Sequence, residues 1–204
     1  MFARLLVCVF VLLVTCFASP VMAQDLSLPL ASKNTNPKVV IDTNYGKITL
    51  ELFADKAPAS VNNFLGYVQS GYYSNTIIHR VSKDFVIQGG AYSADLRKKP
   101  QRNAIALETV ETLKNRRGTI AAARKLSDSN SANSEFFINL VDNPQLDFQS
   151  KISPLNQGFA VFGQIVQGIE VIDKIRKVNT ESKPGFPGLP STPVIIASIS
   201  RVSE

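Results

Sequence analysis

Residues 79–90 read HRVSKDFVIQGG, and this stretch contains the only histidine of a 204-residue chain. Arg80 lies in a run that otherwise has the apolar character of a buried strand, and Phe85 and Gln88 follow at short spacing. Arginine is effectively always charged, so a buried arginine needs a partner or a ligand. The stretch therefore indicates either an arginine that forms a salt bridge at the rim of the fold or an arginine that faces a binding site.

Short strand-like runs lie on both sides of this stretch. Residues 47–53 read KITLELF, in which apolar and polar side chains alternate with the period of a strand. The run before it and the turn TNYG complete a predicted β-hairpin. The sequence predicts strands at 38–42, 47–53, 76–81, 85–88, 118–123, 135–141, 159–166 and 193–202.

Two segments have the period of a helix instead. Within residues 55–71, the apolar side chains Val61, Phe64, Leu65 and Val68 fall at i, i+3, i+4 and i+7. A second helix is predicted at 169–178. Eight short strands and two helices favour a mainly β fold, a closed eight-stranded antiparallel β-barrel capped by the two helices, because closure removes exposed strand edges.

The N-terminus has the pattern of an export signal. Arg4 precedes the apolar run 5–18, and residues 21–23 end in a small residue that fits cleavage before Gln24. We therefore predict a signal peptide at 1–23, a flexible tail at 24–37 and one folded domain at 38–202. The apolar run is shorter than the roughly 20 residues of a membrane span, so we expect no stable membrane insertion after cleavage; an uncleaved anchor is the alternative.

The predicted destination is the periplasm of a bacterium with two membranes, and the alternative is secretion from a bacterium with one. Cys8 and Cys16 both lie in the predicted signal peptide, so the mature chain would have no thiol nucleophile or thiolate ligand. A single histidine excludes a metal site built on several imidazoles, and we expect no cofactor. The net charge of +6 is spread over modest basic clusters, which favours an ordinary solvated surface over nucleic-acid binding.

Several catalytic patterns are absent from the sequence. It contains no G-x-S-x-G elbow, no P-loop and no G-x-G-x-x-G motif. His79 precedes an arginine in a strand-like run, so we interpret it as a structural histidine and not as a proton carrier. What remains is Arg80 among apolar residues.

At this point the sequence resembles a known family. IIHRVSKDFVIQGG (77–90) resembles F-H-R-x-x-x-x-F-x-x-Q-G-G, the signature of the cyclophilins, which are peptidyl-prolyl cis-trans isomerases. Other segments resemble family motifs in the same order: RGTIAAAR (117–124), NSEFFINL (133–140), LD (146–147) and FAVFGQIVQG (159–168). The resemblance covers about residues 38–202 and is closest to the exported bacterial branch.

The resemblance implies a role for each matching residue. Arg80 would be the catalytic arginine, Gln88 would bond the substrate backbone, and Ala123 would lie on the groove for the residue before proline. Phe85, Val86, Phe137 and Leu146 would line the pocket for the proline ring, and Phe159 would form a pocket wall. Arg124 and Glu135 complete the predicted substrate-binding residues, although the family usually has asparagine and glutamine at these positions.

One further departure concerns a drug class. Val86 replaces a methionine, and Gln145 stands where animal cytosolic cyclophilins have a tryptophan that helps to bind cyclosporin. This chain has no tryptophan, so we expect weak cyclosporin binding. The resemblance also suggests a monomer.

The leading hypothesis is therefore an isomerase that assists the folding of exported proteins by a non-covalent mechanism, with proline-containing peptides and unfolded exported proteins as partners. A second hypothesis is a binding module that holds proline-containing segments without relevant turnover. A third is a barrel with an apolar ligand inside. Glu135 and Arg124 could also form a salt bridge with each other and reshape the groove. We predict an irregular loop without an assigned role at 181–192.

Overall fold

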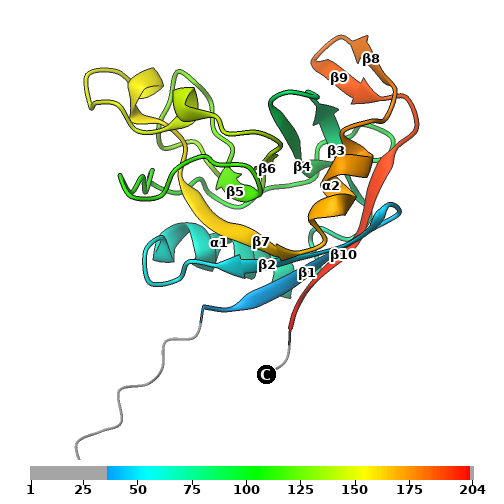
Figure 1. The fold of residues 1–204 in the computed structure, drawn as a ribbon, viewed down its shortest axis with the longest axis horizontal. Coiled ribbons are helices and arrows are strands. Elements are labelled where there is room, and N and C mark those ends of the chain that lie inside the picture. Colours follow the sequence, from blue (N-terminus) through cyan, green and yellow to red (C-terminus); the bar gives the residue numbers. More distant parts are fainter. Residues whose placement is uncertain (1–35, 203–204) are drawn as a thin grey trace, which may run out of the picture. The chain divides into compact units, whose positions relative to one another are not determined.

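The barrel predicted from the sequence is present in the computed structural model, which describes residues 36–202 (Figure 1). Eight strands close in the order β1-β10-β3-β4-β6-β5-β7-β2, and all neighbours are antiparallel. Their bounds are β1 Lys38–Thr43, β2 Gly46–Leu52, β3 Thr76–Val81, β4 Val86–Ser93, β5 Thr119–Ala122, β6 Phe136–Asn139, β7 Val161–Gln167 and β10 Val194–Arg201. This confirms the predicted fold class.

Both predicted helices are present and pack on the barrel core. Helix α1 spans Pro58–Gln69 and helix α2 spans Ile169–Ile175. Their buried apolar side chains join those of the barrel in one cluster, which includes Ile41, Ile48, Leu50, Val61, Phe64, Phe136, Val171, Ile172 and Ile196. The barrel interior is thus filled by side chains, as expected for a small barrel, and this argues against an apolar ligand inside it.

Helix α1 begins with a proline and receives its N-terminal cap from a distant residue. Pro58 has no N–H to satisfy, which suits the first turn of a helix. The Glu108 carboxylate accepts hydrogen bonds from the backbone N–H groups of Ala59 and Ser60 at 3.1 and 3.0 Å. Neither helix within residues 36–202 is long and apolar enough to cross a membrane.

The prediction of an irregular loop at 181–192 is wrong for most of this segment. Strands β8 (Thr180–Lys183) and β9 (Phe186–Pro190) form a two-stranded antiparallel hairpin. Strand β9 packs against β3, and the Phe186 ring contacts His79 edge-on with ring centroids 6.2 Å apart. The hairpin therefore supports the strand that carries Arg80.

Gly89 and Gly90 lie inside a strand. Strand β4 continues through both glycines to Ser93. A side chain at Gly89 would place its Cβ 2.8 Å from the backbone oxygen of Ile77, so glycine is required by the close approach of β3. The signal peptide predicted at 1–23, and the predicted tail through residue 35, lie outside the described residues.

Candidate active site

A cleft of about 500 Å³ lies over the β4-β6-β5 side of the barrel. Every residue predicted for the site except Glu135 lines it: Arg80, Phe85, Val86, Gln88, Ala123, Arg124, Phe137, Leu146 and Phe159. Leu126, Gln145 and Leu155 also line it. No role was predicted for Leu126 and Leu155, because neither belongs to a motif recognised in the sequence.

Strand register explains why distant residues meet here. Arg80 in β3 is paired with Gln88 in β4, and Gln88 is paired with Phe137 in β6. Directly opposed residues of neighbouring strands project from the same face of a sheet. Residues from three strands, β3, β4 and β6, therefore form one row across the barrel wall.

The apolar part of the cleft belongs to a second core cluster. Val86, Ala121, Ala123, Phe137 and Val161 are buried together, apart from the main core. The partly exposed side chains that pack on this cluster are Phe53, Phe85, Leu113, Leu146 and Phe159. The Phe137 and Phe159 rings meet edge-on at 5.5 Å between centroids. The cleft thus has a rigid apolar floor.

Arg80 projects toward this apolar surface. Its Nη1 donates to Gln88 Oε1 at 3.4 Å, and its guanidinium lies 5.8 Å from the centroid of the Phe85 ring. Within residues 36–202, Arg80 forms no ion pair with a carboxylate. For this part of the chain, the alternative of a structural salt bridge at the rim is therefore wrong.

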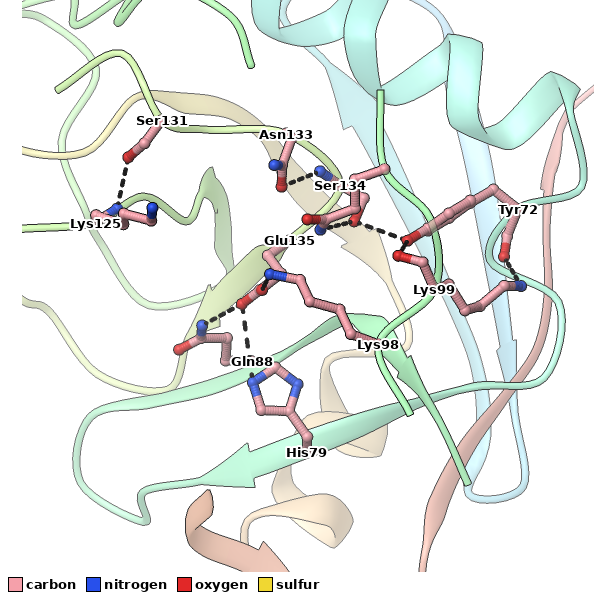
Figure 2. A network of polar contacts seen from close by, with 11 residues as sticks. Tyr72, His79, Gln88, Lys98, Lys99, Lys125, Ser131, Asn133, Ser134 and Glu135 are labelled. Carbon is pink, nitrogen blue, oxygen red and sulfur yellow. Dashed lines mark hydrogen bonds and ion pairs between the residues drawn. The ribbon is translucent and has the colours of Figure 1, made fainter. Parts of the chain in front are cut away.

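Glu135 lies at the centre of a polar network with Gln88, Lys98 and His79 (Figure 2). Gln88 Nε2 donates to Glu135 Oε2 at 3.0 Å, and Lys98 Nζ lies 3.6 Å from Glu135 Oε1. His79 Nε2 is 3.9 Å from the same carboxylate. Glu135 lines a smaller adjoining cleft of about 150 Å³. The network thus runs from Arg80 through Gln88 to Glu135.

Comparison with known proteins identifies the family. The sequence matches the family described as "Cyclophilin type peptidyl-prolyl cis-trans isomerase/CLD" over residues 38–201. The chain belongs to the cyclophilins. It is 43% identical over 166 residues to peptidyl-prolyl cis-trans isomerase B of Escherichia coli, covering 81% of this chain and 99% of that protein. It is 44% identical over 146 residues to isomerase A of Dickeya dadantii, covering 72% of this chain and 74% of that protein.

Solved structures agree with this assignment. A cyclophilin of Cryptosporidium parvum, crystallised in the presence of the dipeptide Ala-Pro, superimposes with a TM-score of 0.67 at 30% identity. The match covers 82% of this chain and 99% of that one. The expected enzyme class, peptidyl-prolyl cis-trans isomerase, is confirmed.

In this cyclophilin, His79 is a buried ring with aromatic neighbours. It is 7% exposed, and its ring meets Tyr92 edge-on at 4.8 Å between centroids. Burial lowers the pKa of His79; the Glu135 carboxylate raises it, and the charges of Arg80 and Lys98 lower it further. His79 is thus neutral near pH 7, in agreement with its interpretation as a structural residue.

Arg124 uses its guanidinium to hold the chain around the cleft. Its Nε donates to the Gly158 carbonyl at 2.9 Å, its Nη2 to the Pro154 carbonyl at 2.6 Å and its Nη1 to the Lys125 carbonyl at 2.9 Å. The guanidinium also lies 4.6 Å from the Phe159 ring centroid. The proposed salt bridge between Arg124 and Glu135 is therefore wrong, because each has other partners.

Buried amides hold two walls of the cleft, and no sequence motif pointed to them. Asn143 Nδ2 donates to the Phe85 carbonyl at 3.1 Å and to Asn139 Oδ1 at 2.8 Å. Asn115 Nδ2 donates to the Leu146 carbonyl at 3.0 Å. Buried polar networks of this kind rigidify a structure when their members are satisfied. Within residues 36–202, no group of three or more His, Cys, Asp or Glu side chains is arranged to hold a metal ion.

Proposed function

We propose that this cyclophilin binds proline-containing segments of exported proteins in the Arg80 cleft and catalyses rotation about their X-Pro bonds as they fold. The reaction breaks no bond. The observation that carries the proposal is a guanidinium at the edge of a rigid apolar cleft, with Gln88 as its partner and with no ion pair to a carboxylate within residues 36–202.

The chemical need follows from the peptide bond. Resonance gives the C–N bond partial double-bond character, and rotation meets a barrier of roughly 18–20 kcal/mol. When the amide twists, the proline nitrogen loses conjugation and gains a lone pair. A donor that hydrogen-bonds to this nitrogen stabilises the twisted form and neither planar form, which is the requirement for catalysis. Arginine fits because it stays protonated and offers several N–H donors.

The size of this effect limits what Arg80 can do alone. A hydrogen bond that involves a charged group contributes about 1.5–3 kcal/mol. At about 1.4 kcal/mol per tenfold change in rate, this corresponds to about 10- to 150-fold. Further acceleration would come from the apolar walls, which desolvate the amide and hold the ring, and from Gln88, which would bond the flanking backbone.

The test is the cis-to-trans relaxation of a short X-Pro peptide in the presence of the purified protein. We expect Arg80→Ala to lower kcat/KM by about 10- to 150-fold. Arg80→Lys keeps the charge and loses the planar fork of donors, so it should recover only part of the rate. Unchanged far-UV circular dichroism would show that each variant is folded.

Two results would count against the proposal. A folded parent protein that leaves the relaxation at the background rate would refute isomerisation of such peptides and would favour the binding-module alternative. An Arg80→Ala variant as fast as the parent would remove the arginine from the mechanism while leaving the enzyme class intact.

The remaining parts of the proposal rest on the sequence. The signal-like segment 1–23 supports export to the periplasm, or secretion where there is one membrane.

We also propose that the protein acts as a monomer and binds cyclosporin weakly. Gln145 lines the cleft at the position where the resemblance places the cyclosporin-binding tryptophan, and tight binding in a calorimetric titration would contradict this.

A further inference from the structure

The cleft is larger than a proline ring requires. Its volume of about 500 Å³ lies within the range of roughly 300–1,000 Å³ that holds drug-sized ligands. Besides Arg80, Phe85 and Phe137, its lining includes Leu126 and Leu155. The same cleft therefore offers an apolar wall to a second group beside the ring.

Leu126 and Leu155 are unusually exposed for large apolar side chains. Leu126 is 58% exposed and Leu155 is 61% exposed. Leu126 follows strand β5, and Leu155 lies in the 3₁₀ helix η2, Pro154–Gln157. Exposed apolar side chains that lie together at a cleft mark a binding surface. Both leucines line the same cleft as the aromatic residues Phe85, Phe137 and Phe159.

The loop that carries Leu155 is held in place. Arg124 donates to the carbonyls on either side of this leucine, those of Pro154 and Gly158. The Ser153 hydroxyl caps η2 by accepting from the Asn156 N–H at 3.4 Å. Preorganisation of this kind lowers the entropic cost of binding. Arg124 thus acts as a positioning residue for the second wall.

We propose that Leu126 and Leu155 form a subsite for a large apolar side chain of the residue next to the proline. This inference rests on the proposed function, because it places the proline ring among Phe85, Phe137 and their neighbours. The occupant is a segment of an unfolded polypeptide, in which apolar side chains are accessible. The enzyme would therefore favour proline bonds that become buried in the folded client.

The test compares peptides that differ only beside the proline. Matched peptides carry leucine or asparagine before the proline, or leucine or asparagine after it, and kcat/KM is measured for each. We expect the parent protein to prefer the leucine peptide at one of these positions. Leu126→Ser and Leu155→Ser should each reduce that leucine-to-asparagine ratio by about three- to tenfold, from the loss of a half-buried apolar contact.

The matched control is Ile152→Ser. Ile152 lies in the same loop as Leu155 and is 89% exposed, but it does not line the cleft. This variant should keep the parent's ratio. All three substitutions are at exposed side chains, so thermal unfolding midpoints should stay near that of the parent.

The outcomes separate the two proposals. If the parent isomerises all peptides and both leucine variants keep its ratio at both positions, the subsite is refuted while the proposed function stands. If the parent isomerises none of them, the proposed function is refuted, and the subsite is judged by fluorescence titration of the same peptides. A leucine preference in binding that both leucine variants reduce would support the subsite, and its absence would refute it.

Discussion

Glu135 determines which way the Gln88 amide faces. A carboxylate only accepts hydrogen bonds, so Gln88 must turn its Nε2 toward Glu135 and its Oε1 toward Arg80. A neutral amide at position 135 could meet Gln88 with either of its ends. The negative charge thus selects the orientation in which Gln88 accepts a hydrogen bond from Arg80.

We expect Glu135→Gln to lower kcat/KM about three- to tenfold, because it replaces a charge-assisted hydrogen bond that fixes Gln88. Peptide relaxation kinetics measure this. Lys98→Gln is the control, since it removes the ion pair at 3.6 Å and leaves the carboxylate that orients Gln88. If Lys98→Gln lowered kcat/KM as much as Glu135→Gln does, the effect would come from the balance of charges and not from the orientation of the Gln88 amide.

Because of His79, we expect the stability of the folded state to depend on pH in the mildly acidic range. Burial lowers its pKa in the folded protein, whereas the unfolded chain has the ordinary value of about 6.5. The unfolded state therefore binds more protons as pH falls through this region, and stability is lost. His79 is the only histidine, so this titration belongs to one group.

We expect the free energy of unfolding in urea to decrease from pH 7.5 to pH 5.5. In His79→Phe, which keeps a ring against Tyr92 and Phe186 but cannot titrate, the decrease should be much smaller. Glu135, Arg80 and Lys98 also face this position, so Lys98→Gln serves as a control that alters a facing charge and leaves the imidazole. Equal pH slopes in the parent and His79→Phe would show that His79 is not responsible.

Most residues of the candidate site were predicted through the resemblance of their segments to cyclophilin motifs. Arg80, Gln88 and Phe137 lie in regular elements, and their motif spacing survives in the sequence. Leu126 and Leu155 were missed because their segments have no periodicity. The carbonyl partners of Arg124 were missed because every residue has a backbone carbonyl, so the residue type does not indicate which carbonyl accepts a hydrogen bond.

At the scale of elements, the β8–β9 hairpin shows why some strands cannot be predicted from the sequence. Residues 181–192 contain Pro184, Pro187 and Pro190, and prolines argue against a strand unless it lies at an edge. Among residues 36–202 this hairpin pairs only with itself, so it tolerates them. Because local propensity is unfavourable, we expect packing against β3 to stabilise it.

Two glycines of this hairpin allow a direct test of that packing. Gly185 and Gly188 both have positive φ, at +80° and +74°. A Cβ at Gly188 would lie 2.7 Å from the Val81 backbone oxygen, whereas a Cβ at Gly185 would meet nothing within 4 Å. Both alanine substitutions incur left-handed strain of about 1–2 kcal/mol, and only Gly188→Ala also forces the hairpin away from β3.

We therefore expect Gly188→Ala to reduce the free energy of unfolding by about 1–3 kcal/mol more than Gly185→Ala does. Urea unfolding of the two variants and the parent measures the difference. Equal losses would mean that the hairpin moves away from β3 at no cost, so that the contact contributes little to stability.

At the scale of the whole molecule, the barrel could be predicted from the number of strands and the need to close edges. The order of the strands could not. Strand β6 lies between β4 and β5, and β10 lies between β1 and β3. Such pairings join residues far apart in the sequence, and no local pattern records them.

The proposed export can be tested on the whole chain. Expressed in a bacterium with two membranes, the protein should appear in the periplasmic fraction with Gln24 as its first residue, as N-terminal sequencing would show. Ala23→Phe should keep the 1–23 segment attached, because cleavage needs a small residue at this position. Isolation of the chain from the cytoplasm with its first residues intact would refute the signal assignment.

Closure of the barrel also affects how the chain folds during synthesis or translocation. Strand β10 is the last strand along the chain, and it pairs with β1 on one side and β3 on the other. While a ribosome or a membrane channel still holds residues 194–201, the edges of β1 and β3 that await this strand stay open. Open edges can pair with other chains. The barrel can therefore close its last two strand pairings only after nearly all of the domain has emerged. Until then the chain is not locked into a closed barrel and can still pass through a channel. A chaperone would protect the open edges of β1 and β3 best in the interval just before β10 is released.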